Sequence, residues 1–463
     1  MPVDPLCIET IAAVGTPLGE GGIAIIRISG PSAVSIAEAI FRPAGRPRSL
    51  EHMRLIYGFI VDPENDHKID EVLLSFMKAP HSYTREDVIE LNLHGGPLPV
   101  RQVMDLILSR GARMARPGEF TLRAFLRGRI DLPQAEAVLD IIRAKTEKSL
   151  EVAFKQLEGK LSTRVHEARL AVLGILARIE ACLDFPEEED VLLSVPGLRG
   201  ELGCLVSEIE NFLKNADEGR IYRDGYRVVI TGKVNAGKSS LFNRLLREGR
   251  VLVTEVPGTT RDSIEEWIQV GGIPLVLVDT AGLRETADPI ENLGMERSRE
   301  AITRADLVIL VMDTSAALPG EDRILLGELK GRRLFIVLNK MDLPSEMDVG
   351  EIGRLFPDAP LSGVSLVTGA GVEEMESLLS ETVGRGIDAA PEGPLVSNIR
   401  HRDALLRSVE FLKKASESLE SGLSVEFAAL DLRGAVESLG EVTGESVTEN
   451  LLELIFSRFC IGK

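Results

Sequence analysis

Residues 232–240 have the types and spacing needed to hold phosphate groups. Four of them match the pattern G-x-x-x-x-G-K-[ST]: Gly232, Gly237, Lys238 and Ser239. In such a loop the glycines let backbone N–H groups approach phosphates, the lysine reaches the β- and γ-phosphates, and the serine hydroxyl ligates Mg²⁺. The match lies between a strand-like run and a helix-like run, so it predicts a nucleotide-binding loop at a helix N-terminus. The other loop residues expected at the nucleotide are Asn235, Ala236 and Ser240.

Two further segments are placed to meet the metal and the γ-phosphate. Thr260, in PGTTRD, is positioned to supply a second Mg²⁺ ligand. Asp279 and Gly282, in LVLVDTAG, come at the end of an apolar run, where they would face Mg²⁺ and the γ-phosphate. These segments follow the phosphate loop in the order expected of a GTPase.

The segment IVLNKMD indicates guanine as the base, with Asn339, Lys340 and Asp342 after another apolar run. An aspartate carboxylate accepts both N1–H and N2–H of guanine, whereas adenine would leave that acceptor unpaired. Ser365, in VSLVTGAG, stands where GTPases often have Ser-Ala-Lys. Leu366 and Val367 replace the last two residues, so we expect this loop to contact guanine through its backbone.

Hydrolysis must be organised without the glutamine that Ras-like proteins place after D-x-x-G, because Leu283 follows Gly282. The Asn235 carboxamide is a candidate ligand for a monovalent cation beside the phosphates, and its alternative is a local hydrogen bond in the loop. Glu291 is a candidate to polarise the attacking water, and its alternative is an ordinary surface carboxylate. Lys238 would act on the transferred phosphate.

The elements that must position these residues fall into four segments. The length of 463 residues exceeds one hydrophobic core and suggests about three domains. Short β-rich runs with glycine breaks predict an α+β domain at 1–120, and apolar spacings of three and four predict bundle helices at 121–217 and 384–463. An α/β nucleotide-binding domain at 218–383 would be inserted between the two helical segments.

Composition limits the partners and the compartment. A formal net charge of −19 disfavours broad binding to nucleic acid or anionic membrane, but allows an RNA substrate on a local basic patch. No apolar run approaches the ~20 residues that span a bilayer, and the N-terminus lacks signal-peptide regions. The chain is therefore expected to be cytoplasmic and free of membrane. The four cysteines are far apart, which argues against a zinc site or a disulfide framework.

The last residues, FCIGK, resemble a C-a-a-X prenylation signal, although Gly462 and Lys463 fit its positions poorly. Apolar residues continue through Phe459, which predicts a terminal helix that carries the last four residues to a fixed place. Two interpretations stay open: a functional tail, or a buried cysteine followed by a frayed end.

Together these motifs resemble the MnmE (TrmE) family of tRNA-modification GTPases. The flanking motifs make the likeness specific: TPLGEGGIAIIRISG, LHGGP, ARPGEFTLRAFLRGRIDLPQAEAV and the terminal FCIGK. The resemblance implies an N-terminal tetrahydrofolate-binding domain, a helical domain, and an inserted Ras-like G domain that dimerises around K⁺. It also implies a homodimer that acts with MnmG, a partner carrying FAD, to install an aminomethyl-type group at C5 of the wobble uridine of tRNA, with a one-carbon unit from a folate.

The resemblance also implies roles for single residues. It implies that the K⁺ ligands are Asn235, Thr254, Val256 and Thr259, and that Thr254 and Thr259 also lie beside GTP. It implies that the Mg²⁺ ligands are Ser239 and Thr260, and that Glu291 is the catalytic glutamate. Four residues would contact the folate: Arg27, Glu90, Arg129 and Lys463. Cys460 would lie close to the one-carbon chemistry.

One of these positions departs from the family. Arg129 falls where the family more often has lysine, which keeps the charge but changes the donor geometry.

Two other functions remain as alternatives. A ribosome-assembly or regulatory GTPase related to Era would share the asparagine in the phosphate loop, but such proteins append an RNA-binding module. A plain nucleotide switch would use the flanking domains only as scaffolding, and failure to bind any reduced folate would favour it.

Overall fold

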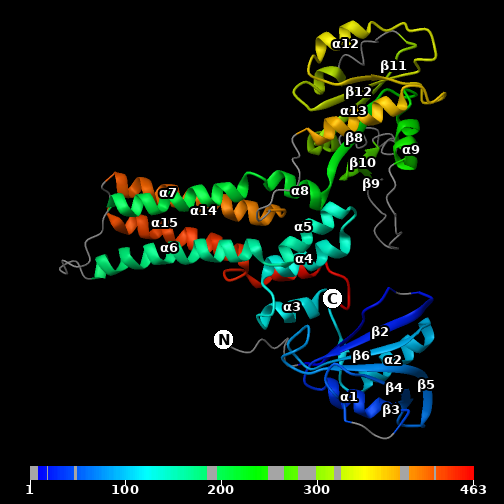
Figure 1. The fold of residues 1–463 in the computed structure, drawn as a ribbon, viewed down its shortest axis with the longest axis vertical. Coiled ribbons are helices and arrows are strands. Elements are labelled where there is room, and N and C mark those ends of the chain that lie inside the picture. The colour runs from blue at the N-terminus through cyan, green and yellow to red at the C-terminus, as the bar shows by residue number, and fades with distance from the viewer. Residues whose placement is uncertain are drawn as a thin grey trace, which may run out of the picture. The chain divides into compact units, whose positions relative to one another are not determined.

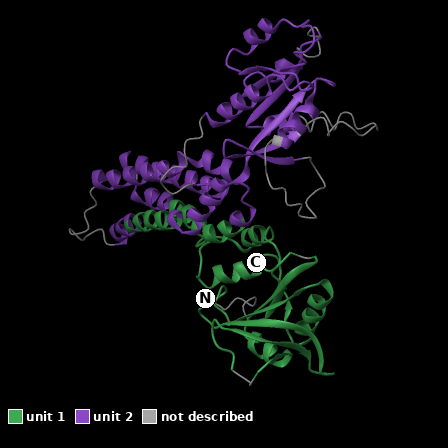
Figure 2. Cartoon of the chain, turned by 45° about the vertical axis from the view of Figure 1, so that its right-hand side comes forward, with its two compact units in different colours: residues 1–139, 162–174, 433–463 green, residues 140–161, 175–432 purple. Residues whose placement is uncertain are grey.

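The structure is a computed structural model, and it describes residues 9–17, 19–45, 49–184, 195–248, 265–279, 299–316, 325–385, 396–421 and 424–463. The chain divides into two compact units, coloured separately in Figure 2. Unit 1 contains residues 1–139, 162–174 and 433–463, and unit 2 contains residues 140–161 and 175–432. The domain boundaries expected at 120, 217 and 383 are not tested by this division and stay predictions.

Unit 1 is built on a seven-stranded sheet with the order β3-β4-β5-β6-β2-β1-β7. Its strands are β1 (Ile11–Val14), β2 (Gly21–Ser29), β3 (Phe41–Pro43), β4 (Leu55–Asp62), β5 (His67–Met77), β6 (Val88–Gly95) and β7 (Arg113–Met114). Side chains alternate between the two faces of a strand, so Ile26 and Ile28 enter the core while Arg27 lies on the other face. Antiparallel pairing of β2 with β6 sets Arg27 opposite Glu90.

The helices of unit 1 cover the sheet and hold the C-terminal segment. The helices α1 (Ala33–Ile40) and α2 (Pro97–Ser109) pack against the buried face of the sheet. Further along come α3 (Glu119–Leu126), α4 (Leu132–Arg143), which ends in unit 2, and α16 (Glu449–Phe456). Phe456 and Phe459 pack with Leu132, Ala135 and Leu139, so the predicted terminal helix is present and anchored by apolar contacts.

Unit 2 contains most of the helical layer. Its helices are α5 (Glu147–Leu157), α7 (Val195–Leu213), α8 (Ala216–Asp224) and α14 (Ile399–Glu420), with parts of α6 (Lys160–Asp184) and α15 (Val425–Thr443). The helices α7 and α14 pack against each other, although the α/β domain separates them in sequence (Figure 1). Within the described ranges, no helix is both long enough and apolar enough to cross a membrane.

The α/β domain of unit 2 has a six-stranded sheet with the order β13-β12-β11-β8-β10-β9. Its strands are β8 (Tyr226–Gly232), β9 (Glu265–Val270), β10 (Ile273–Asp279), β11 (Leu307–Asp313), β12 (Leu334–Asn339) and β13 (Leu361–Gly363). All neighbours pair in parallel except β9. Buried clusters lie on both faces, and the described helices of the domain include α9 (Lys238–Glu248), α12 (Val349–Leu355) and α13 (Val372–Gly384).

This topology determines where a ligand can bind. In a parallel sheet covered on both faces, ligands bind beyond the carboxyl ends of the strands. Four strands end at that edge with residues able to do chemistry or to allow close approach: Gly232, Asp279, Asp313 and Asn339.

Candidate functional site

The phosphate loop joins β8 to α9 at the carboxyl edge of the six-stranded sheet. Gly237 has a φ of +106°, and a Cβ at this position would lie 2.2 Å from Asn339 Nδ2. Glycine is therefore required both by the backbone conformation and by the neighbouring side chain. The helix α9 follows at once, since Leu241 N–H donates to the Gly237 carbonyl at 2.9 Å. Its exposed N-terminal residues include Ser239 and Ser240.

Lys238 is buried beneath this loop, with a relative exposure of 8%. Its ammonium group donates to the Lys233 carbonyl at 2.8 Å, so the side chain folds back along the loop. A lysine held there carries its charge into the space that the backbone N–H groups surround. The geometry fits the phosphate contact expected for Lys238.

Asn339 connects the phosphate loop to a second loop. Its side chain is buried, with Nδ2 donating to the Ala236 carbonyl at 2.8 Å and Oδ1 accepting from Leu366 N–H at 3.2 Å. Ser365 is buried beside it and accepts from Thr368 N–H at 3.2 Å. The structure thus uses the Asn339 carboxamide to hold two loops together, a role that the motif alone did not indicate.

Asp342 lies on the exposed side of the same edge. Among the described residues its carboxylate has no hydrogen-bond or ion-pair partner, so both oxygens are available to two parallel N–H donors such as those of guanine. Met341 precedes Asp342 in the sequence and Val367 lies on the loop of Ser365; their side chains are 52% and 88% exposed. The flat face of a purine ring is a suitable partner for such apolar side chains.

Asp313 is a site residue that the sequence interpretation missed. Lys340 Nζ lies 2.5 Å from Asp313 Oδ2, and Ser315 also donates to this carboxylate. Burial raises the pKa of Asp313, but the Lys340 and Ser315 hydrogen bonds outweigh it, so its pKa lies below the ordinary value. The available signal was an aspartate directly after the apolar run LVILVM, at the same edge as Asn339.

Several predicted ligands lie outside the described residues: Thr254, Val256, Thr259, Thr260, Gly282 and Glu291. The backbone of Asp279 ends β10 beside Ile230, but the description does not extend to its side chain. Ser239 and Asp279 supply oxygen donors, which suit Mg²⁺. In the described part of the chain, no group of three or more His, Cys, Asp or Glu side chains is arranged to hold a metal.

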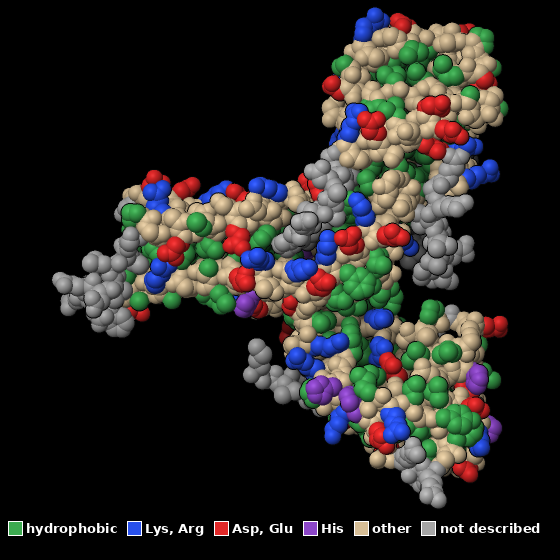
Figure 3. Space-filling view, viewed as in Figure 1, with side chains coloured by type: hydrophobic (Ala, Val, Ile, Leu, Met, Phe, Trp, Pro, Cys, Tyr) green, Lys and Arg blue, Asp and Glu red, His purple; other side chains and the backbone are tan. Residues whose placement is uncertain are grey.

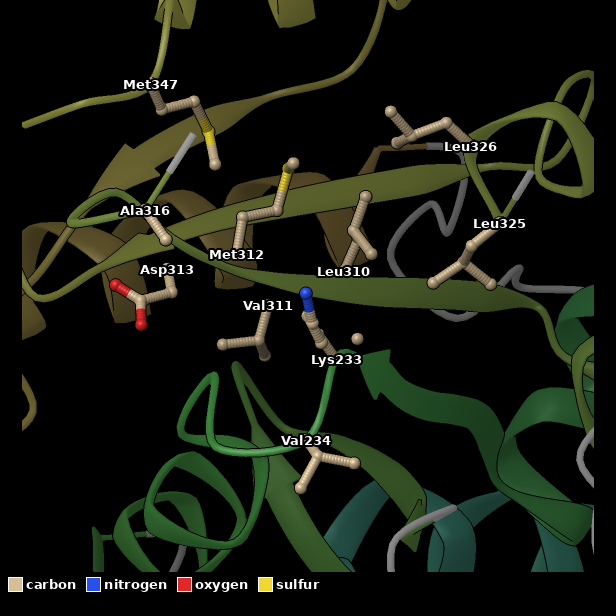
Figure 4. A pocket seen from close by; sticks show the side chains of 11 residues that line it. Lys233, Val234, Leu310, Val311, Met312, Asp313, Ala316, Leu325, Leu326 and Met347 are labelled. Carbon is tan, nitrogen blue, oxygen red and sulfur yellow. The ribbon is translucent and has the colours of Figure 1, made fainter. Parts of the chain in front are cut away.

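A cavity of about 150 Å³ adjoins the phosphate loop on its β11 side (Figure 4). The side chains of Met312 and Met347 lie on the β11 side of this space, and Lys233 and Val234 border it from the loop. Its lining is mainly apolar, which is unlike a phosphate site. This cavity therefore does not match the phosphate contacts predicted around Lys238, which stay a prediction.

Unit 1 contains a second site, around Arg27. The Arg27 guanidinium forms an ion pair with Glu90 at 2.6 Å and donates through Nη1 to the Gly462 carbonyl at 3.1 Å. Its Cζ also lies 5.6 Å from the Phe120 ring centroid. The structure therefore brings Arg27 and Glu90 together with the last residues of the sequence.

The tail is fixed by backbone contacts. Gly462 has a φ of +90°, and a Cβ there would lie 2.6 Å from the Val14 carbonyl, so the tail lies against β1 with no space for a side chain. At the start of α3, Gly118 N–H donates to the Cys460 carbonyl at 3.4 Å and Phe120 N–H donates to the Lys463 oxygen at 3.2 Å. Cys460 itself is exposed. These contacts exclude a frayed end and a buried cysteine.

Arg129 reaches the same region through Tyr83, another residue missed from the sequence. The Arg129 guanidinium lies 4.6 Å from the Tyr83 ring centroid and donates to the Tyr83 carbonyl at 3.1 Å. The Tyr83 hydroxyl is 3.0 Å from Thr121 Oγ1. Burial raises the pKa of Tyr83, while Thr121 and the charges of Arg129 and Arg27 act to lower it. The charges of Arg129 and Arg27 therefore both act on the pKa of the same tyrosine hydroxyl.

Comparison with known proteins gives the family. A model of the MnmE helical domain matches residues 132–460, and a model of the GTP-binding protein TrmE N-terminus matches residues 10–129. The chain belongs to the MnmE family. The resemblance expected from the sequence motifs is confirmed.

Curated relatives match over nearly the whole chain. The tRNA modification GTPase MnmE of Desulforamulus reducens is 45% identical over 98% of this chain and 99% of its own length. The MnmE of Geotalea uraniireducens is 46% identical, with the same coverage of both chains. Among solved structures, the G domain of the FeoB iron transporter of T. maritima matches 34% of this chain and 98% of its own, with 28% identity and a TM-score of 0.26.

Proposed function

We propose that this chain is a GTPase that takes part in tRNA modification, which is the activity that the names of its relatives state. One observation supports the GTPase part most strongly. Asn339 joins the phosphate loop to the loop of Ser365, so phosphate recognition and base recognition meet at one edge of the sheet. An Era-like ribosome-assembly role has less support, because models of both flanking domains belong to the MnmE family.

Different residues of the nucleotide site would bind the phosphates, Mg²⁺ and the guanine base. Backbone N–H groups of the phosphate loop and the Lys238 ammonium would bind the β- and γ-phosphates and stabilise charge on the transferred group. Ser239 and Thr260 would hold Mg²⁺, which supplies further positive charge when bound, and Asp279 would face the ion and the γ-phosphate. Asp342 would accept from the guanine ring, and the backbone of the Ser365 loop would complete the base contact.

Hydrolysis would depend on K⁺. Asn235 is exposed in the phosphate loop with a φ of +65°, so its side chain is available for an ion beside the phosphates. The remaining K⁺ ligands would be Thr254, Val256 and Thr259, and Glu291 would orient the attacking water. This proposal rests on the family resemblance and on Leu283, which offers no hydrogen bond to water.

The site around Arg27 would bind the folate. Arg27, Glu90, Arg129 and Lys463 combine charges of both signs with the Tyr83 and Phe120 rings, which suits a ligand with a flat heterocycle and an anionic tail. The exposed Cys460 would lie at the edge of this site. We extend the proposal to a cytoplasmic homodimer that works with an FAD-carrying MnmG-type partner on C5 of the wobble uridine.

The test of the GTPase proposal is GTP turnover by the purified full chain in K⁺ and in Na⁺ buffers of equal ionic strength. We expect turnover in K⁺ and little in Na⁺, because a cation must replace the missing glutamine or arginine. Asn235→Ala should lose the K⁺ response, and Glu291→Ala should retain nucleotide affinity while turnover falls. Equal rates in both salts would remove the cation mechanism, and absence of GTP binding would remove the function.

The tRNA part needs a separate measurement. Purified chain, its FAD-carrying partner, GTP, a reduced folate, an amine to supply the nitrogen, and unmodified tRNA should together form the C5-modified uridine, detected by mass spectrometry of digested tRNA. Cys460→Ser should lower this product while K⁺-dependent GTP hydrolysis persists. A chain that hydrolyses GTP but yields no modified uridine with any reduced folate would be a nucleotide switch with scaffolding domains.

A further inference from the structure

An exposed basic surface lies on unit 1 beside the second site. We call it the basic rim, and it consists of His52, Lys78, His81, Arg85 and Arg127. In Figure 3, Lys, Arg and His side chains gather over this part of unit 1. The loop between β5 and β6 contributes three members of the rim, and the end of α3 contributes Arg127.

Specific contacts hold the rim residues in two groups. His52 and His81 have ring centroids 6.1 Å apart, and His52 Nδ1 accepts from Lys78 N–H at 2.9 Å. Arg85 donates through Nη1 to the Arg127 carbonyl at 2.8 Å. The two arginines therefore stand side by side, although 42 residues separate them in sequence.

A cavity of about 370 Å³ opens between these arginines. Its lining comprises Gly30, Pro31, Ala79, Arg85, Glu86, Asp87 and Arg127. Arg85 adopts a left-handed φ of +56°, so the backbone turns at the cavity wall. A space of this size accommodates a phosphate group together with part of a ribose.

The carboxylates in the wall are already engaged. Glu86 is buried and accepts from Ser29 Oγ at 2.6 Å, from Arg123 at 3.0 Å and from Arg127 at 2.7 Å. Asp87 Oδ1 accepts from Ala79 N–H at 2.9 Å. Lys78, by contrast, has no ion-pair partner among the described residues. Asp87 keeps its negative charge, but Lys78 and Arg85 leave the exposed charge of the rim net positive.

The rim differs in charge from the chain as a whole. The full chain has 72 acidic and 53 basic residues, whereas the rim combines Lys78, Arg85 and Arg127 with two histidines. A polyanion would be repelled by most of this protein and attracted locally here. Such a distribution directs a nucleic acid to one place instead of allowing broad binding.

We propose that the basic rim binds the phosphodiester backbone of tRNA. This inference rests on the proposed function and adds a surface to it. Arg85 contacts a phosphate from the cavity wall, Lys78 contacts a neighbouring phosphate from outside the cavity, and the cavity receives a phosphate and its sugar. Arginine and lysine supply the charge-assisted contacts that commonly fix nucleic-acid backbones in register. Tyr83 lies between His81 and Arg85 in the sequence and its ring contacts Arg129, so RNA bound at the rim would come close to Arg129.

The test measures tRNA binding by the full chain with a fluorescent unmodified tRNA transcript at several salt concentrations. Arg85→Asn suits the left-handed backbone and removes one charge, and Lys78→Ala removes a second. We expect each change to weaken binding by ~3- to 10-fold and to reduce the slope of log K against log[salt] by ~1, as for lost phosphate contacts. The double variant should show both losses combined.

A matched control and a folding readout make the result interpretable. Arg101→Ala removes an exposed arginine from α2, which starts at the opposite end of β6, and it should bind tRNA as the wild type does. K⁺-dependent GTP turnover should be the same in all variants. Wild-type affinity and salt slope in the double variant would contradict tRNA binding at the rim, while the proposed function in tRNA modification would still stand. Failure of the wild type to bind or modify tRNA would instead overturn the proposed function.

The same variants distinguish RNA from an anionic membrane. Vesicles containing anionic lipid, added in place of tRNA, should not bind the full chain at physiological salt. Vesicle binding that is lost in the double variant, with tRNA binding unchanged, would assign the rim to a membrane and contradict the proposal.

Discussion

The nucleotide site and the proposed folate site around Arg27 differ in how far apart in the sequence their residues lie. In unit 2, the phosphate loop is a single contiguous stretch, and the longest bond that completes it, from Asn339 to Ala236, spans 103 residues. In unit 1, the bond from Arg27 to Gly462 spans 435 residues. The first site takes most of its geometry from local backbone conformation, whereas the second exists only when distant segments are packed together.

This difference gives the two sites different weaknesses. A local loop fails when its backbone conformation is disturbed, while an assembled site also fails when a remote anchor is lost. The tail of unit 1 depends on α3, whose first turn receives it, and α3 in turn depends on a buried ion network. Glu119 accepts from Arg113 at 2.6 Å and from Arg123 at 2.9 Å, and Arg123 also reaches Glu86.

The largest effect is expected from Gly237→Ala. The added Cβ would lie 2.2 Å from Asn339 Nδ2 in a backbone conformation that alanine rarely adopts. Strain of this kind costs ~1–3 kcal/mol. The added Cβ would also displace the Asn339 side chain, which braces the two loops, so GTP affinity should fall by ~100-fold or more. Calorimetric titration with GTP and with a reduced folate would check it. An equal loss of folate affinity would contradict the independence of the two sites.

Asn339→Ala should have the next largest effect. It leaves the Ala236 carbonyl and Leu366 N–H without their partner, and an unsatisfied buried group costs ~1–3 kcal/mol. GTP affinity should fall by ~30-fold with unchanged preference for guanine. The matched variant Asp342→Asn should instead shift preference toward xanthine nucleotides, since an amide donates where the carboxylate accepted. If both variants change base preference alike, Asn339 reads the base and is not a brace.

Gly462→Ala should affect only unit 1. The added Cβ would lie 2.6 Å from the Val14 carbonyl at a φ of +90°, so the tail should leave β1. Reduced-folate affinity should then fall by ~10-fold, from strain of ~1–2 kcal/mol, while K⁺-dependent GTP turnover persists. Ile461→Ala provides the control, because Ile461 is half exposed. Normal folate binding in Gly462→Ala would show that the C-terminal tail is not part of the folate-binding site.

Acid should loosen unit 1 through Glu119, with the smallest effect. Burial raises the pKa of Glu119, but hydrogen bonds from Arg113, Arg116 N–H and Arg123 outweigh it, so the folded pKa lies below the ordinary value of a glutamate. A depressed pKa adds stability above the unfolded value, and this stability is lost as pH falls through the folded one. Thermal melts between pH 6 and 3, compared with Glu119→Gln, should show a shallower acid limb in the variant. If the melting temperatures of the two proteins fall equally steeply with acid, Glu119 does not contribute to the pH dependence of stability.

The sequence was informative where residues act through local backbone. The strand-loop-helix context of Lys238 and the apolar run before Asn339 predicted their places at one sheet edge, because parallel strands end together. The pairing of Arg27 with Glu90 and the docking of Gly462 had no local signal. The family resemblance implied folate contacts for Arg27, Glu90 and Lys463, but it predicted neither of these contacts. Tyr83 and Asp313 were missed since their roles depend on partners far away in sequence, Arg129 and Lys340.

The two hydrogen bonds of Asn339 have a thermodynamic consequence. One carboxamide holds the loop for the phosphates and the loop for the base, so ordering either loop reduces the entropy cost of ordering the other. Guanosine and pyrophosphate, offered as separate molecules, should therefore bind with positive cooperativity. By linkage, each would raise the affinity for the other by the same factor. Through this single side chain, the identity of the base influences how firmly the phosphates are held.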